Sequence, residues 1–157
     1  MKKALLAIFL FFSFNLYGAG AKIDIPKYDW SWKGFFGTYD RASAQRGLKV
    51  YREVCAGCHS MNYLSYRNLA DLGFSEDHIK AIAAEHLVLD GPNDEGEMFE
   101  RDGIPSDQFV NPYLNENAAR AANNGAYPPD LSLIVKARPK GADYIKALLL
   151  GYVDPPE

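Results

Sequence analysis

The stretch Val54-Cys55-Ala56-Gly57-Cys58-His59 determines how the rest of the chain is interpreted. It contains a Cys-x-x-Cys-His box, the pattern by which a c-type haem is attached to a protein. Side chains three positions apart lie on one face of a helix, so the two thiols can bond the two vinyl groups on one edge of a porphyrin. His59 follows at once and can bind the iron as its proximal ligand. The box therefore predicts one covalent haem c.

A cysteine pair of this spacing has other uses, because redox disulfides and zinc sites share the Cys-x-x-Cys pattern. The chain has two cysteines in all, so it offers no second pair to complete a zinc site. No strand–turn–helix pattern suggests a thioredoxin-like unit, and the histidine that follows the pair favours haem. A dithiol or disulfide stays open as the alternative.

The first 21 residues are predicted to be a signal peptide. Lys2 and Lys3 precede an apolar run from Ala4 to Phe14, and Ala19-Gly20-Ala21 is a small-residue cleavage site. The alternative is a retained membrane anchor, for which this run falls short of the roughly 18–20 apolar residues that a span needs. We therefore expect residues 22–157 to form one exported domain.

The charge balance of residues 22–157 is acidic, with 15 basic and 20 acidic residues and a net charge of −5. A nucleic-acid-binding surface requires clustered positive charge. The balance therefore argues against nucleic acid as a partner.

The segment from Lys22 to Asp40 contains six aromatic residues and is predicted to be irregular because of Pro26, Gly34 and Gly37. One interpretation is an arm that packs over the core of the domain. The other is an arm that lies on a neighbouring subunit or at the membrane interface, where Trp and Tyr are favoured. The sequence leaves both open.

A helix is predicted to start at Ser43 as its N-cap and to run through the haem box. Leu48, Tyr51 and the two cysteines recur at spacings of three and four, which places them on one face. Gly47 lies on the adjoining stripe, where a second helix could approach closely. No such partner helix is obvious in this chain.

Other helices are predicted from caps and from apolar periodicity, and they make the expected fold class all-α. Ile79, Ile82 and Ala83 should be buried in one helix, and Leu131, Ile134 and Val135 in another. The expected ranges are Asn62 to Asp71 ended by Gly73, Glu76 to Leu87 capped by Ser75, Asn117 to Asn123 stopped at Asn124-Gly125, Leu131 to Arg138, and Tyr144 to Leu150 stopped by Gly151.

The stretch from Asp90 to Asp107 is predicted to be a loop, because five Gly and Pro residues interrupt it. It carries seven acidic residues against Arg101 alone, a net charge of −6 in 18 residues. Such a run is usually a solvated surface. Next to a haem edge it could also attract a basic electron-transfer partner over long range.

Several further stretches carry a family resemblance. From about Tyr28 to Glu157 the chain resembles the cytochrome c1 family, the haem subunit of the cytochrome bc1 complex. The matching stretches are Arg46-Gly47, Tyr51 to Val54 leading into the box, Asp90-Gly91-Pro92-Asn93, Gly96-Glu97-Met98-Phe99, Asn111-Pro112-Tyr113, Ala118 to Ala126, Pro128-Pro129-Asp130-Leu131-Ser132, and Gly151-Tyr152 near Pro155-Pro156.

The resemblance implies a cytochrome c-like fold of short helices and long loops around one covalent haem. It implies that Cys55 and Cys58 hold the haem and that His59 is the iron ligand. The residues that it implies around the haem are Tyr51, Asn123, Pro128, Pro129, Ile134, Arg138 and Tyr144. The guanidinium of Arg138 suits a haem propionate. Asn123 also fits a helix cap, and Tyr144 also fits the core.

The resemblance also implies a function, which is electron transfer within the ubiquinol–cytochrome c reductase. The electron would come from the Rieske iron–sulfur protein and pass to a soluble basic cytochrome c, with cytochrome b as a further subunit. The place implied is the periplasmic face of the bacterial inner membrane. Alternatives are a free-standing periplasmic monohaem carrier and a ligand-binding or peroxidase-like haem protein.

Members of this family continue beyond the point at which this sequence ends, and the resemblance implies three features there. These are the methionine that binds iron as the sixth ligand, a helix that crosses the haem-box helix, and a C-terminal membrane anchor. We therefore expect a truncated or split gene product. Substitute ligands in this chain are Met98, His78 and His86, whereas Met61 lies too close to His59 to reach the opposite side of a haem.

Overall fold

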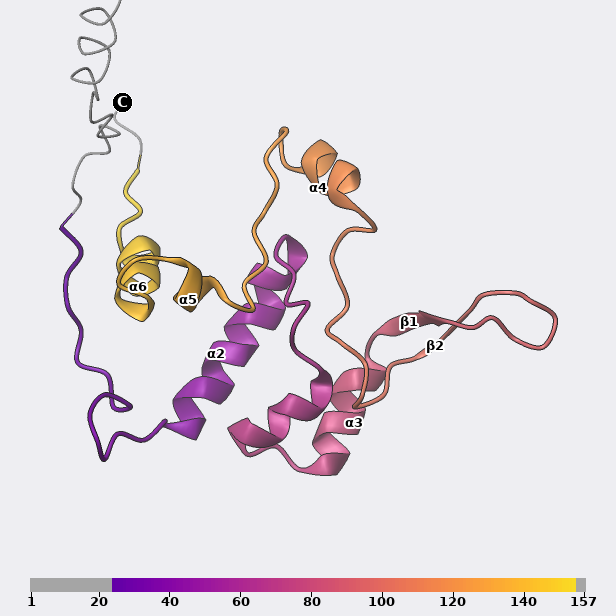
Figure 1. The fold of residues 1–157 in the computed structure, drawn as a ribbon, viewed down its shortest axis with the longest axis horizontal. Helices are drawn as coiled ribbons and strands as arrows, with labels where there is room; N and C mark the ends of the chain where they lie inside the picture. The colour runs from indigo at the N-terminus through magenta and orange to yellow at the C-terminus, as the bar shows by residue number, and fades with distance from the viewer. Residues whose placement is uncertain (1–23, 155–157) are drawn as a thin grey trace, which may run out of the picture.

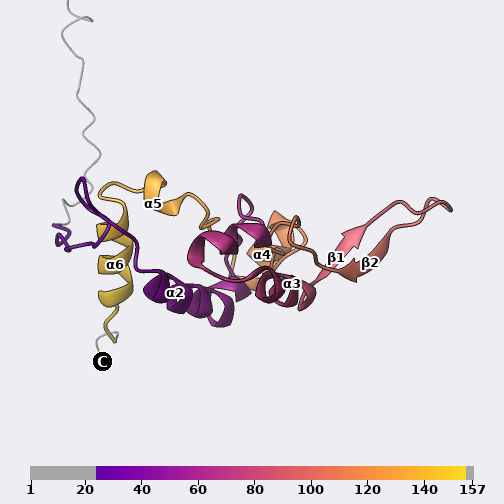
Figure 2. The same ribbon diagram turned by 90° about the horizontal axis from the view of Figure 1, so that it is seen from below.

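A computed structural model describes residues 24–154 of the chain, so the predicted signal peptide lies outside the described residues. Helix α2 crosses the middle of the ribbon in Figure 1. The N-terminal arm and helices α5 and α6 lie on one side of it, and helix α3 lies on the other. Figure 2 shows a two-stranded hairpin at the opposite end of the molecule from α6.

Helix α2 spans Arg41–Glu53, and its N-cap is Asp40 rather than the predicted Ser43. The Asp40 carboxylate accepts a hydrogen bond from the backbone N–H of Ser43 at 3.2 Å. Ser43 is thus the third residue of the helix. Both residue types cap well, and the side chain that reaches a free N–H of the first turn is that of Asp40.

The haem box does not continue α2 as a regular helix, which corrects the sequence prediction. After Glu53 the chain enters a short 3₁₀ helix, η1, at Cys55–Gly57. The amides of Cys58 and His59 both bond to the carbonyl of Cys55, at 3.1 and 2.8 Å. Val54 and Gly57 are poor helix formers, and this tight turn replaces a helical turn at that point.

The core lies between the 3₁₀ helix η2, Tyr66–Leu72, and helix α3, Glu76–Ala84. As predicted, Gly73 ends η2 in the left-handed conformation with φ 88°. Ser75 caps α3 as predicted, although this helix ends three residues earlier than expected. The buried residues are Tyr66, Leu69, Ile79, Ile82, Ala83 and Phe109, and Leu48, Met61, Leu64, Leu72 and Phe74 pack against them.

A β-hairpin corrects both the all-α prediction and the predicted loop at Asp90 to Asp107. Strand β1, Leu87–Asp90, pairs antiparallel with strand β2, Phe99–Asp102. Leu87, Val88 and Leu89 favour a strand, and the left-handed Gly91 and Gly96 allow the chain to reverse. The alternation was hidden in the sequence because Leu87 and Leu89 occupy the exposed positions of β1, whereas Asp90 and Arg101 are half-buried. Residues 24–154 are therefore mainly helical with one hairpin.

Residues 116–150 contain three short helices joined by irregular segments. Helix α4 spans Glu116–Ala122, and the positive φ of Asn124 and Gly125 confirms the predicted stop. Helix α5 spans only Ile134–Ala137, and Val135, predicted to be buried, is 49% exposed. Helix α6 spans Ala142–Leu150 and ends at Gly151 as predicted.

The N-terminal arm, residues 24–40, packs against α6 rather than against the buried core. The indole N–H of Trp30 donates to Asp143 at 2.6 Å, and Lys146 lies 4.2 Å from the ring centre of Tyr28. At the tip of the arm, Phe35 and Phe36 are 95% and 90% exposed. The arm thus combines an intramolecular contact with an exposed aromatic pair. Within residues 24–154, no helix has the length and apolar character needed to cross a membrane.

Candidate haem site

The two cysteines of the box are free thiols in accessible positions. Cys55 is half-buried and Cys58 is exposed. The hydroxyl of Tyr113 lies 3.9 Å from the sulfur of Cys58, and it accepts a hydrogen bond from the side-chain amide of Asn123 at 3.1 Å. The turn η1 holds both thiols next to His59. A group attached through two sulfurs would therefore meet the histidine directly.

His59 is oriented by a hydrogen bond to a distant part of the chain. Its Nδ1 lies 2.8 Å from the carbonyl oxygen of Pro129. A carbonyl can only accept, so the proton of the neutral imidazole lies on Nδ1 and the lone pair lies on Nε2. Metal-binding histidines are held in this way, with one nitrogen bonded to a backbone carbonyl and the other free for the metal. The residues present thus fit a haem held by two thioethers and one histidine.

Tyr51 supports the same histidine from the other side. Its side chain is buried, 7% exposed, and its hydroxyl donates to the backbone carbonyl of His59 at 3.1 Å. Burial raises the pKa of Tyr51 to about 12, with smaller contributions from Asp130 and Cys55. Tyr51 was predicted at the haem edge, and its contact with His59 places it at the box.

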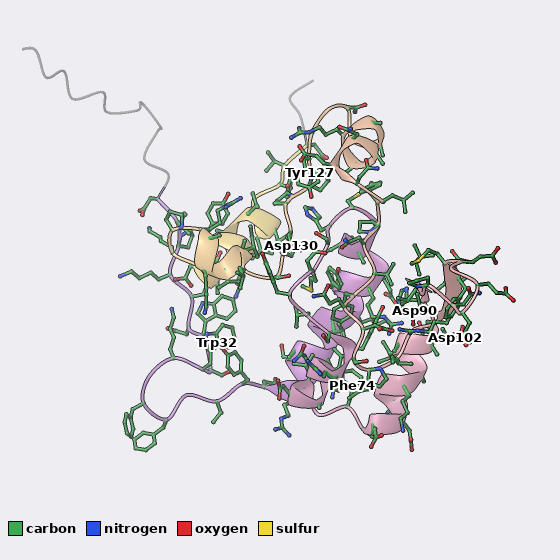
Figure 3. All side chains as sticks on the ribbon, turned by 45° about the vertical axis from the view of Figure 1, so that its right-hand side comes forward. Trp32, Phe74, Asp90, Asp102, Tyr127 and Asp130 are labelled. Atoms are coloured by element: carbon green, nitrogen blue, oxygen red, sulfur yellow. The ribbon has the colours of Figure 1, made fainter. Side chains whose placement is uncertain are left out.

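Hydrogen bonds join Asp130, which follows Pro129, to Ser60 and Asn62, which follow the box. One carboxylate oxygen of Asp130 accepts from the Ser60 hydroxyl at 2.9 Å and from the Asn62 N–H at 2.7 Å. Its other oxygen accepts from the Ser132 N–H at 2.8 Å. Figure 3 shows Asp130 between the α5–α6 region and α2. We call residues 59–63 and 129–132, with these bonds, the proximal network.

Two further bonds complete the proximal network. The N–H of Leu131 donates to the carbonyl of Ser60 at 2.9 Å, and the N–H of Tyr63 donates to the Ser132 hydroxyl at 3.1 Å. Partial burial acts to raise the pKa of Asp130, but the hydrogen bonds from Asn62, Ser132 and Ser60 outweigh it and hold the pKa below its ordinary value. Asp130 is therefore ionised near neutral pH.

Sequence reasoning did not assign a role to Asp130, Ser60, Ser132 or Tyr113. The sequence Asp130-Leu131-Ser132 contains a local signal, because Asp often accepts from the N–H two residues later. Nothing in the sequence indicates that the same carboxylate also reaches Ser60 and Asn62. Those bonds join residues about 70 positions apart.

The other predicted haem residues fall into two groups. Pro128 lines a hollow of about 90 Å³ together with Cys58, Tyr113 and Ala119, and Asn123 ends α4 while bonding to Tyr113. Asn123 thus caps α4 and also lies near the box. Pro129 contributes its carbonyl to His59.

Ile134, Arg138 and Tyr144 lie further along the chain, at α5 and α6. Tyr144 lines a hollow of about 530 Å³ between α6 and the N-terminal arm, together with Tyr28 and Leu148. Among the described residues, the one side-chain hydrogen bond of Arg138 goes to the neighbouring carbonyl of Ala137. The haem contacts of these three residues stay predictions.

The candidate sixth ligands occupy three separate places. His78 bonds to Ser75 at the start of α3, and the His86 ring stacks on Tyr66 with 5.8 Å between centres. Met98 is 54% exposed and precedes β2 in the hairpin, whereas Met61 packs against the core. None of these contacts tests the ligand role, which stays a prediction.

The face of α2 around Gly47 is open among the described residues. A Cβ added at Gly47 would have no atom within 4 Å, and a groove of about 440 Å³ follows this face. Its lining includes Leu48, Tyr51, Leu64 and Phe109. The crossing helix that would cover this face stays a prediction.

The acidic hairpin, residues 87–107, contains two carboxylates that are paired with Arg101 and five that are unpaired among the described residues. Arg101 donates to Asp107 at 2.7 and 3.0 Å and also contacts Asp90, and these hydrogen bonds lower the pKa of both carboxyls. Figure 3 shows Asp90 and Asp102 on the hairpin. The remaining acidic residues are exposed and form no ion pair with a described residue: Asp94, Glu95, Glu97, Glu100 and Asp102.

The free thiols, the orienting bond on His59 and the proximal network fit the attachment side of a c-type haem site. Comparison with known proteins agrees, since the Cytochrome C1 family matches residues 30–157. The chain therefore belongs to the cytochrome c1 family.

Three relatives illustrate the extent of the match. A mitochondrial cytochrome c1 haem protein of Arabidopsis thaliana is 58% identical over 134 residues, which cover 85% of this chain and 44% of that protein. Cytochrome c1 of Rhodospirillum rubrum is 55% identical over 83% of this chain and 48% of its own length. The mitochondrial cytochrome b-c1 complex catalytic subunit of Candida albicans is 53% identical over 83% and 46%. The chain thus spans a little under half the length of these relatives.

Proposed function

We propose that this chain holds one haem c through thioether bonds from Cys55 and Cys58, with His59 as the proximal iron ligand, and that it transfers electrons. The observation that carries the proposal is the 2.8 Å contact between His59 Nδ1 and the Pro129 carbonyl directly after the box. This contact leaves Nε2 free for a metal. A dithiol or a disulfide would have no use for an oriented histidine at that position.

The haem would supply one-electron exchange between ferric and ferrous iron. The residues of this chain would hold and orient it. The two thiols fix its edge, the Pro129 carbonyl keeps the proton of His59 on Nδ1, and Tyr51 holds the backbone of His59 in place. No proton needs to move in such a reaction, so the site requires no general acid or base.

We further propose that the chain works as the cytochrome c1 subunit of a bacterial ubiquinol–cytochrome c reductase. It would face the periplasm at the inner membrane, next to cytochrome b, and take electrons from the Rieske iron–sulfur protein. The family match supports this role, as does the name of the Candida relative, which places that protein in a cytochrome b-c1 complex. The electron acceptor would be a soluble basic cytochrome c.

The acidic hairpin supports the proposal that the electron acceptor is a basic protein. Its five unpaired carboxylates are exposed on an element that projects from the molecule (Figure 2). Charges of one sign on a projecting surface raise the encounter rate with an oppositely charged protein, and salt screens this attraction. Pairing of Asp90 and Asp107 with Arg101 stabilises the hairpin, while its other acidic residues stay charged.

Stopped-flow oxidation of the reduced complex by a basic cytochrome c tests this docking role. We expect Glu95→Gln together with Glu97→Gln to lower the association rate several-fold at low salt and to have little effect near 1 M salt, where the Debye length is about 3 Å. The matched control is Asp29→Asn with Asp71→Asn, which removes two exposed charges away from the hairpin. Equal effects of the two pairs, or no effect of either, would contradict a specific role for the hairpin.

A further inference from the structure

Asp130 occupies a central position in the proximal network. It is the one charged side chain in that network, and its two oxygens accept three hydrogen bonds of 2.7–2.9 Å. Two of these bonds come from the segment after the box, and one comes from its own segment. The carboxylate therefore ties the two segments together at a single point.

The hydrogen bonds to Asp130 hold the residue next to the carbonyl that orients His59. Pro129 precedes Asp130, so its carbonyl belongs to the peptide unit that the carboxylate side chain fixes. The ring of Pro129 already restricts φ, and Pro129 has no N–H of its own. The direction of its carbonyl then depends on the neighbouring peptide, which the bonds from Ser60 and Asn62 hold in place.

Asp is the side chain that meets this geometry. An ionised carboxylate offers two acceptor oxygens and no donor, whereas an amide replaces one oxygen with an NH₂ group. An asparagine here would present its NH₂ either to the Asn62 N–H or to the Ser132 N–H, and both of these are donors. One side of the network would therefore lose its bonds.

We propose that Asp130 is a positioning residue that sets the strength of the hydrogen bond between His59 Nδ1 and the Pro129 carbonyl, and through it the donor strength of Nε2 toward iron. The inference rests on the proposed haem function. A strong bond to Nδ1–H makes an imidazole a more basic ligand. A more basic ligand favours ferric over ferrous iron, so loosening this bond raises the reduction potential.

The test compares three variants of the haem-loaded protein. Asp130→Asn breaks the network at the carboxylate, and Ser60→Ala removes one of its three bonds. Glu53→Gln removes an exposed carboxylate two residues before the box without touching the network. The readouts are the midpoint potential and the rate at which the His59 Nδ1 proton exchanges with solvent, followed by NMR. Amide exchange of Leu69 and Ile79 in the core reports any general loosening.

We expect Asp130→Asn to speed exchange of the Nδ1 proton on the order of tenfold. It should also raise the potential enough to change the ferrous-to-ferric ratio about tenfold, which is about 59 mV for one electron. Ser60→Ala should produce smaller shifts of the same sign, with core exchange unchanged. If Asp130→Asn accumulates poorly, the result for Ser60→Ala tests the inference by itself. Glu53→Gln should leave Nδ1 exchange unchanged.

Two results would overturn the inference. One is Nδ1 exchange at the rate of the unaltered protein in both Asp130→Asn and Ser60→Ala. The other is a rise in potential that Glu53→Gln reproduces in full, since that would assign the effect to charge alone. Covalent haem content, measured in the same samples, is a separate outcome. Its absence from the unaltered protein would refute the proposed function instead.

Discussion

The proximal network and the acidic hairpin both depend on carboxylates, but they use them in opposite ways. Asp130 is half-buried and accepts three hydrogen bonds, two of which join segments about 70 residues apart. The hairpin exposes five acidic side chains, three in its turn and two on β2, that form no ion pair with a described residue. The first arrangement fixes geometry, and the second leaves charge available to a partner. Substitution of Asp130 should therefore change mainly stability, and substitution of the exposed acids of the hairpin should change mainly the association rate with a partner.

The largest effect on stability should come from Asp130→Ala. The substitution leaves the Ser60 hydroxyl and the N–H groups of Asn62 and Ser132 without their acceptor. Hydrogen bonds to charged groups are worth about 1.5–3 kcal/mol each in net terms, and part of the loss is recovered by water. We expect the free energy of unfolding to fall by about 2–3 kcal/mol, measured by urea denaturation. A loss no larger than that of an exposed substitution would remove the distinction between the two regions.

The ion pairs of Arg101 in the hairpin should respond to acid. Hydrogen bonds from Arg101 hold the pKa of Asp90 and Asp107 below the ordinary value in the folded protein. Their contribution is thus fully present above the unfolded pKa of about 3.9 and is lost as the pH falls through the lower folded values. Amide exchange in β1 and β2 should accelerate below about pH 4, before exchange in α3. Arg101→Gln should make hairpin exchange fast at neutral pH and remove most of the acid response; an unchanged acid response would be inconsistent with this pairing.

Asp143 is a third case: its carboxylate is hydrogen-bonded, but it holds the N-terminal arm rather than the haem box. Its carboxylate accepts from the Trp30 indole and from the Tyr28 N–H, and the Trp30 bond lowers the pKa of this carboxyl. Both hydrogen bonds end on the same carboxylate oxygen, so Asp143→Ala, which removes it, should loosen the N-terminal arm without loosening the core, and trypsin should cleave several-fold faster after Lys33. Lys140→Gln is the matched control on the same side of the molecule, because it contacts the arm only at Ile25 and Asp24. Cleavage at the original rate in Asp143→Ala would show that the hydrogen bonds from Trp30 and Tyr28 to Asp143 do not hold the arm.

The smallest effect on stability should come from the tip of the hairpin. Glu95→Gln with Glu97→Gln removes two exposed charges that make no described ion pair, and such changes usually alter stability by less than about 0.5 kcal/mol. Relief of repulsion among neighbouring acids could even raise stability slightly. Urea denaturation measures this directly. A loss above about 1 kcal/mol would mean that these side chains contribute to the fold rather than to docking.

Local signals in the sequence predicted the parts of the fold that depend on a few neighbouring residues. Ser75 caps α3, Gly73 ends η2, and Asn124 with Gly125 ends α4, each through the conformation that its residue type favours. The box likewise identified the thiols and the histidine. In each case the deciding interactions join residues no more than five positions apart.

The parts that the sequence did not predict depend on longer-range interactions or on competing local ones. The turn η1 replaced a helix because Val54 and Gly57 weaken helical propagation at the box. Strands β1 and β2 stabilise each other across a turn, and their exposed and half-buried positions do not follow an alternation of polar and apolar residues. The partners of Asp130 lie about 70 residues away, so no window of sequence contains them.

The most direct test of the haem assignment is the mass of the exported, denatured chain. We expect it to exceed the mass of the polypeptide by one haem, with the haem retained in acidic organic solvent because both thioethers are covalent. Cys58→Ala should leave at most one thioether, and the pyridine haemochrome spectrum should shift accordingly. A chain of polypeptide mass, a haem that solvent extracts, or an unchanged spectrum in Cys58→Ala would contradict attachment through Cys55 and Cys58.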